Sequence, residues 1–315
     1  MRIAFWIALV STALLAPVQA VFAQSFPAKM VRVVIPFPVG GSSEANFRII
    51  SPHLSERWKQ QILLEPRPGA AATIGADYVA KSAPDGYTLL LTSTQYVQGP
   101  ALFAKLPYDS LADLMPVTIV SISPQAIVAH PSLPAKNIRE LIALARTRAA
   151  DLNMGNAGNM LPTHFFTMLA KVKIEPVPYK GAGPLMTDLM GGHIPLAIAA
   201  VSSVQGAVRA GRARILGVSS HSGTFPDAPI IAKDLPGFDA DAWFGLFVAH
   251  GTPREIVGRI HVDVAAVLQM PDVKQRLLQI GGNPGGQTPE EFTTRVRNEI
   301  AKWKKVAAAA GMKPQ

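Results

Sequence analysis

The most constraining feature of this sequence is a strand that leads through a glycine pair into a helix. Residues 31–37 form a near-continuous apolar run, Gly40 and Gly41 follow, and the Ser-Ser-Glu at 42–44 is typical of a helix start. A second such loop, Asn-Ala-Gly-Asn at 156–159, precedes another helix. The first N–H groups of a helix are unpaired and lie at the positive end of its dipole. The two loops therefore predict two anion cradles, on two lobes, that hold the carboxylates of one small acid.

Each residue near these loops also has an ordinary structural interpretation. The glycine pair alone is equally consistent with a tight turn, and Glu44 either lines a cleft or favours the helix start through the dipole, the second being preferred. Asn159 is the expected N-cap of the later helix. His164 is more often a satisfied core or capping histidine than a ligand contact. Tyr179 is expected to cover the cleft.

Residues 1–23 predict a cleavable export signal. Arg2 precedes the apolar run Ile3–Ala16, and two small-x-small cleavage sites follow at 18–20 and 21–23. The run is shorter than the roughly 20 residues that a bilayer span needs, so an uncleaved anchor is the less favoured alternative. The chain contains 0 cysteines, which predicts stability from core burial rather than disulfides.

Strand and helix signals alternate along the chain, which predicts an α/β fold with largely parallel sheets. Pro52 should kink or shorten the first helix. Three later helix starts carry an N-cap residue with Glu three positions on: Asn137–Glu140, Thr252–Glu255 and Thr288–Glu291. The last helix presents one apolar face: Phe292, Val296, Ile300 and Trp303.

Two apolar strands end alike, in Val-Ala-His at 128–130 and 248–250. If both strands cross between lobes, they form the hinge and enclose an inserted domain. This predicts domain I over 24–125 and 246–315, and domain II over 126–245.

Composition and motifs argue against several function classes. The formal net charge is +9, but the basic residues are dispersed, which argues against a nucleic-acid surface. There is no Gly-x-Ser-x-Gly elbow, Walker loop or His-Glu-x-x-His, and the histidines lack metal-ligand spacing. A hydrolase using Ser42 or Ser43 with a histidine remains an alternative of low weight, because no base is placed by spacing.

The whole mature chain resembles the Bug family, the periplasmic solute-binding proteins of tripartite tricarboxylate transporters. The motifs that carry the resemblance follow one another along the chain: Ile35–Pro38 with the glycine pair, Glu65–Ala70, Ala83–Leu89, Leu106–Asp109, Ala157–Asn159, His164, Val177–Gly181, Asp188–Gly192, Ala242–Leu246 and Gly251–Pro253.

The resemblance implies an α/β, two-domain, type II-like Venus flytrap protein with two crossover hinge strands. It implies a monomeric, periplasmic, non-enzymatic protein that captures a small carboxylate between its lobes and delivers it to membrane permease subunits. No metal or other cofactor is implied. The alternative output is sensing, in which the loaded protein docks on a signalling domain.

The expected ligand contacts come from the two glycine loops and from polar residues at the carboxyl ends of strands, where open α/β sheets bind ligands. They are Phe37, Gly40, Gly41, Ser42, Ser43, Thr92, Ser93, Thr94, Asn156, Gly158, Asn159, Thr163, His164, Tyr179, Ser202 and Ser203.

The chain departs from the family pattern near this site. No acidic residue follows the strand at 196–199, where the family usually has one, and Met160 and Leu161 stand where it has glycine and serine. These changes predict a more apolar site for an aromatic or alkyl carboxylic acid, and disfavour an amino-acid ligand.

Overall fold

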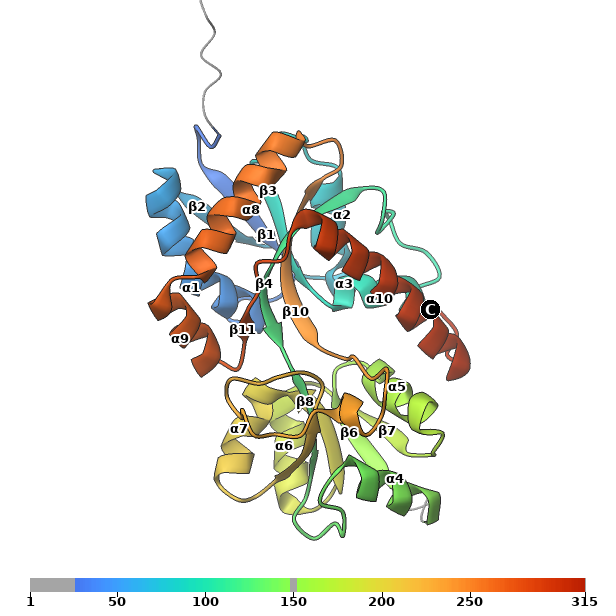
Figure 1. Ribbon diagram of the computed structural model, residues 1–315. Helices are drawn as coiled ribbons and strands as arrows, with labels where there is room; N and C mark the ends of the chain where they lie inside the picture. Colours follow the sequence, from blue (N-terminus) through green and yellow to red (C-terminus); the bar gives the residue numbers. More distant parts are fainter. Residues whose placement is uncertain (1–25, 148–151, 315) are drawn as a thin grey trace, which may run out of the picture.

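The computed structural model describes residues 26–147 and 152–314, in two lobes (Figure 1). The predicted export signal at 1–23 lies outside the described residues. The first lobe holds a six-stranded sheet in the order β11-β4-β10-β3-β1-β2. Its strands are β1 (Val31–Ile35), β2 (Ile62–Pro66), β3 (Thr88–Ser93), β4 (Leu114–Ser123), β10 (Ala242–Ala249) and β11 (Asn283–Pro284).

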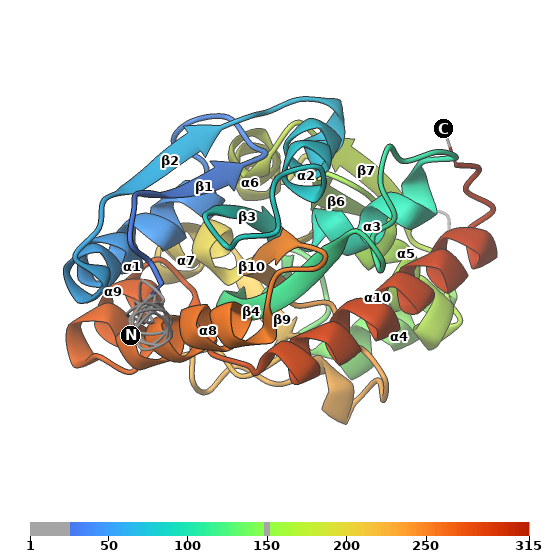
Figure 2. The ribbon, with the colours of Figure 1, turned by 90° about the horizontal axis from the view of Figure 1, so that it is seen from above.

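Helices cover both faces of this sheet. Figure 2 shows α1 (Ser42–Trp58), α8 (Arg254–Leu268) and α9 (Pro271–Gln279) side by side. The other helical elements of the lobe are η1 (Ala70–Ala72), α2 (Thr73–Ala80), α3 (Gln95–Leu102) and α10 (Pro289–Ala309). The apolar run at 31–35 supplies both faces, since Val33 packs in the core beneath α1 and α8 whereas Val34 packs in the other core.

The second lobe holds a five-stranded sheet in the order β7-β6-β8-β5-β9. Its strands are β5 (Gln125–Ala129), β6 (Asn153–Ala157), β7 (Glu175–Tyr179), β8 (Leu196–Ala200) and β9 (Arg214–Val218). The helices are α4 (Ile138–Thr147), α5 (Leu161–Ala170), α6 (Ala182–Gly191), α7 (Val201–Arg209) and the short η2 (Ile231–Lys233).

The chain passes twice between the lobes. It leaves β4 at Ser123 and enters β5 at Gln125, and it returns through residues 219–241 into β10. The lobes also share one apolar cluster, in which Phe165 of α5 meets Trp303 of α10 edge to face at 5.7 Å. The domain bounds themselves, 24–125 with 246–315 and 126–245, stay a prediction.

The expectation of largely parallel sheets is wrong, because both sheets are mixed. β10 pairs antiparallel with β3 and β4, and β5 pairs antiparallel with β8 and β9. Only strands joined through strand–helix–strand units, such as β1 with β2 and β6 with β7, run parallel. Each antiparallel pair includes a strand next to one of the two passages between the lobes, namely β4, β5, β9 or β10.

Two local expectations also differ from the structure. α1 is not shortened at Pro52 and continues to Trp58, because its buried face outweighs the roughly 3 kcal/mol that an interior proline costs, while the alternative of a kink at Pro52 stays a prediction. Thr252 does not cap α8, which starts at Arg254. The Thr252 hydroxyl instead donates to the Ala249 carbonyl at 2.7 Å.

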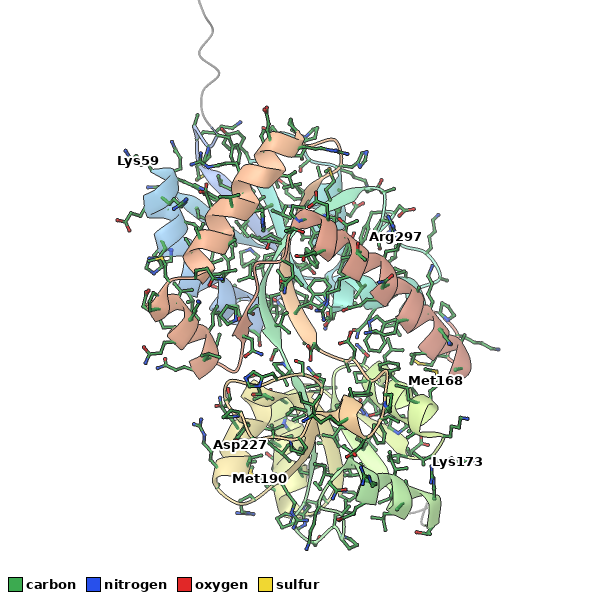
Figure 3. All side chains as sticks on the ribbon, viewed as in Figure 1. Lys59, Met168, Lys173, Met190, Asp227 and Arg297 are labelled. Carbon is green, nitrogen blue, oxygen red and sulfur yellow. The ribbon has the colours of Figure 1, made fainter. Side chains whose placement is uncertain are left out.

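The other helix predictions are confirmed. Asn137 accepts from the Glu140 N–H at 2.9 Å, and Thr288 and Glu291 form a capping box. The predicted face of α10 is buried. Basic side chains such as Lys59, Lys173 and Arg297 are spread over different outer faces (Figure 3). Within the described ranges, every helix is too short or too polar to cross a bilayer.

Candidate ligand site between the lobes

Two adjoining cavities lie between the lobes. The main cavity has a volume of about 350 Å³ and the side cavity about 150 Å³, and both are lined by residues of each lobe. A larger hollow of about 710 Å³ lies at the amino ends of β1 and β3, but its lining comes from the first lobe alone. Ligands of open α/β sheets bind at the carboxyl ends of strands, so the two cavities between the lobes are the candidate site.

The first glycine loop is held by an acid beneath it. Gly40 has φ +81°, a conformation that glycine adopts without strain, and its N–H donates to Glu44 at 2.8 Å. Arg48 donates to the same carboxylate at 2.7 Å. These two donors, first the Gly40 N–H and then Arg48, hold the pKa of Glu44 below its ordinary value. Glu44 lines neither cavity, so it supports the loop and the helix start instead of lining the cleft.

Helix starts supply the positive potential of the site. α1, α3, α5 and α7 all begin at the cavities, and no side-chain cap satisfies the N-terminus of α1. No Lys, Arg or His of the described residues lines either cavity. A carboxylate here would therefore be held by backbone N–H groups, helix dipoles and neutral hydroxyl and amide donors rather than by a basic side chain. The same absence leaves Ser42 and Ser43 without a histidine base for the hydrolase alternative.

The second loop reaches across the cleft. Asn159 donates from Nδ2 to Oε1 of Gln98, on α3 of the first lobe, at 2.7 Å. Its Oδ1 accepts from the Leu161 N–H at 3.0 Å. The N-cap of α5 is Met160, so the expectation that Asn159 is the N-cap is off by one position. Asn159 nevertheless satisfies the first N–H of the helix while bonding to the other lobe.

The structure brings more than half of the expected contact residues to the cavities, where their contact with a ligand stays a prediction. The main cavity is lined by Phe37, Gly41, Ser42, Ser43, Ser93, Thr94 and Asn159. The side cavity is lined by Ser42, Ser202 and Ser203.

The other expected residues, Gly40, Thr92, Asn156, Gly158, Thr163, His164 and Tyr179, lie outside both cavities. Thr163 donates to Asn156 at 2.9 Å in the interior of the second lobe. The Tyr179 hydroxyl donates to Asp188 at 2.8 Å, which ties β7 to α6 rather than covering the cleft. Burial lowers the pKa of His164, which suits the core role preferred for it.

The two residues predicted to make the site more apolar do not line it. Leu161 is fully buried in the core, and Met160 lines neither cavity. The side chains that do line the main cavity are mostly hydroxyl and amide groups. Sequence reasoning missed Gln95, Gln98, Gln125, Ala240, Asp241, Ala242 and Phe244. Their one sequence signal is the Ala242–Leu246 motif, which marks the return strand.

Asp241 is the acid at this site, and it joins the two passages between the lobes. The Gln125 N–H donates to the Ser219 hydroxyl at 2.8 Å, and that hydroxyl donates to Asp241. Burial raises the pKa of Asp241 above its ordinary value, against the opposing effect of the Ser219 and Ser220 hydroxyls.

Two mixed α/β lobes joined by two passages, with a polar cavity between them, define a two-lobed solute-binding protein of the Venus flytrap type. The chain belongs to the tripartite tricarboxylate transporter family receptors, whose family model matches residues 46–312. This is a family of receptors rather than of enzymes, and the resemblance to the Bug proteins is confirmed.

Three similar proteins illustrate the relationship. Protein BugT of Bordetella pertussis is 33% identical over 303 residues, which cover 93% of each chain. The structure of R. palustris Rpa4515 with adipate has a TM-score of 0.76 and 33% identity, covering 92% of this chain and 100% of that chain. MatC from Rhodopseudomonas palustris with bound malate has a TM-score of 0.72 and 30% identity, covering 90% and 100%.

Proposed function

We propose that this protein captures a small carboxylate between its lobes in the periplasm and delivers it to the membrane permease of a tripartite transporter. The observation that carries the proposal is that four helices begin at the two adjoining cavities, α1, α3 and α5 at the main cavity and α1 and α7 at the side cavity, while no basic side chain of the described residues lines either one. Backbone N–H groups at helix starts bind carboxylates well. The adipate and malate of the two Rhodopseudomonas structures support the same class of ligand.

Capture requires that the ligand favour the closed arrangement of the lobes. The contacts between the lobes include the hydrogen bond from Asn159 to Gln98 and the close approach of Gly281 to the start of α7. A ligand that touches both lobes binds the closed form more tightly than the open form and shifts the population toward it. The permease then recognises the closed, ligand-bound form of the receptor.

The test is a thermal-shift and calorimetric screen of the periplasmic protein, after dialysis, against C3–C8 carboxylates. A ligand at a hundred times its dissociation constant stabilises the fold by about 2.7 kcal/mol. Ser42 lines both cavities, so the bulky side chain of Ser42→Trp should block ligand binding and abolish the shift. Thr147→Trp, on the exposed end of α4, is the matched control and should keep it.

Two results would contradict the proposal: a panel in which no carboxylate binds, or equal binding to Ser42→Trp and the wild type. The transport output has a separate test, because the loaded protein should co-purify with permease subunits from membranes. Capture of a sensor protein instead would support the signalling alternative.

A further inference from the structure

The main cavity has a single ionisable side chain among the described residues that line it, and that side chain is an acid. Asp241 is only 8% exposed. None of the described residues that line the side cavity has an ionisable side chain. A receptor for anions thus places a carboxylate of its own in the binding cavity, where a ligand's second carboxylate would meet a like charge.

The hydrogen bonds around Asp241 leave it able to accept more. An N–H group only donates, so the Ser219 oxygen accepts from Gln125 and its own proton goes to Asp241 Oδ1. Ser220 also favours the ionised form. A carboxylate has about four lone-pair positions for acceptance. Two hydroxyls therefore leave acceptor capacity on this carboxylate, which lines the main cavity.

The surrounding charges do not neutralise this acid. Asp239, on the same segment, opposes its ionisation, and Arg295 of α10 favours it. Arg295, however, donates to Glu299 at 2.7 Å, and no salt bridge in the described parts of the chain includes Asp241. A buried carboxylate without a cationic partner is costly, and a donor supplied by a ligand relieves that cost.

We propose that Asp241 is the specificity-determining residue of the cavity: it accepts a hydrogen bond from a hydroxyl or ammonium group on the carbon chain of a monocarboxylate ligand. The ligand's carboxylate lies at the helix starts, and its donor group lies at Asp241. A dicarboxylate that places its second carboxylate at Asp241 is disfavoured. This inference rests on the proposed function, and it replaces the expectation of an aromatic or alkyl acid.

The test compares ligands that differ in one group at one carbon. Butyrate, 4-hydroxybutyrate, 4-aminobutyrate and glutarate form one such set, and the sets with one carbon fewer and with one or two more are measured beside it by calorimetry. In the best-fitting set, the hydroxyl or ammonium compound should bind the wild type at least tenfold more tightly than the unsubstituted acid and the dicarboxylate. A preference for ammonium over hydroxyl identifies an amino acid, and the reverse identifies a hydroxy acid.

In the variant Asp241→Asn, the ratio of the dissociation constant of the dicarboxylate to that of the ammonium compound should fall at least tenfold. Asp227→Asn removes an exposed acid from the same segment without touching either cavity, and it should keep the wild-type ratio. The ratio between ligands is the readout, since a merely structural change would weaken all ligands together. Asp241→Ser provides a second variant if the first folds poorly.

The inference is overturned if the wild type prefers the dicarboxylate or the unsubstituted acid, or if Asp241→Asn keeps the wild-type ratio. Either result leaves carboxylate capture intact. Failure of every carboxylate to bind the wild type would instead refute the proposed function, and this inference with it.

Discussion

Asn159 of the second lobe donates a hydrogen bond to Gln98 of the first lobe, at 2.7 Å across the cleft. Gln98 is buried, and both residues line the main cavity. The contact belongs to the closed arrangement, because separating the lobes breaks it. Side chains at the cavity therefore serve both to line it and to hold it shut.

Gln98→Ala should weaken ligand binding while changing the stability of the free protein less. A neutral hydrogen bond contributes about 0.5–1.5 kcal/mol, so the dissociation constant should rise about two- to tenfold. Stopped-flow fluorescence should show the change mainly in the dissociation rate. An unchanged dissociation rate would mean that this bond does not hold the closed form.

Gly281→Ala should prevent full closure. A Cβ at Gly281 would lie 2.7 Å from Ser202 Cα at the start of α7, and the two residues belong to different lobes. The matched control is Gly211→Ala, because Gly211 also has a positive φ (+68° beside +77°) but has open space around it. Small-angle scattering with saturating ligand should show a larger radius of gyration for Gly281→Ala alone. Equal radii for the two variants would count against a closure contact.

Asp263→Asn should destabilise the first lobe at neutral pH by about 1.5–3 kcal/mol, because Asp263 accepts from Arg57, Arg259 and Trp58. Burial alone would raise the pKa of Asp263, but these donors outweigh it and lower the pKa below 3.8. A depressed pKa gives stability that is present above the ordinary value and is lost as the pH falls through the folded value. Urea unfolding from pH 7 to pH 3 should show the wild type approaching the variant below about pH 4. A constant difference would contradict this assignment.

Asp241 should show the opposite pH dependence. Burial raises the pKa of Asp241 above 3.8, so the native state holds its proton more tightly than the unfolded chain does. Ionisation then lowers the free energy of unfolding as the pH rises from about 3.8 to the raised folded value. Without ligand, Asp241→Asn should be at least as stable as the wild type at pH 7. Marked destabilisation of the variant in urea would show that the ionised acid is needed for folding.

Local features of the fold could be predicted from the sequence. The capping box of Thr288 with Glu291 lies within four residues, and the alternation of Val33 and Val34 between two cores follows from one apolar run. The mixed sheets could not be predicted, because the direction of β10 depends on where the chain returns after completing the second lobe.

The same division holds for the candidate site. The glycine loop before α1 has a local pattern, and Gly41, Ser42 and Ser43 from it line the main cavity. Asp241 lies in an irregular segment, and only the return of the chain brings it to Ser219 and Gln125. Thr163 and Asn156 were expected at the cavity because they lie beside a glycine loop. Their side chains instead form a hydrogen bond with each other, and neither lines the cavity.

Helix starts, rather than lysine or arginine side chains, supply the attraction for anions in this cavity. Peptide dipoles have no proton to gain or lose, so acidity and lysine-modifying reagents leave that attraction in place. A pH dependence of capture can come from Asp241, from Glu44 beneath the first loop, or from the ligand itself. The attraction of such a receptor for anions therefore persists when the surrounding medium turns acidic. The proposed role of Asp241 is to select which of those anions binds.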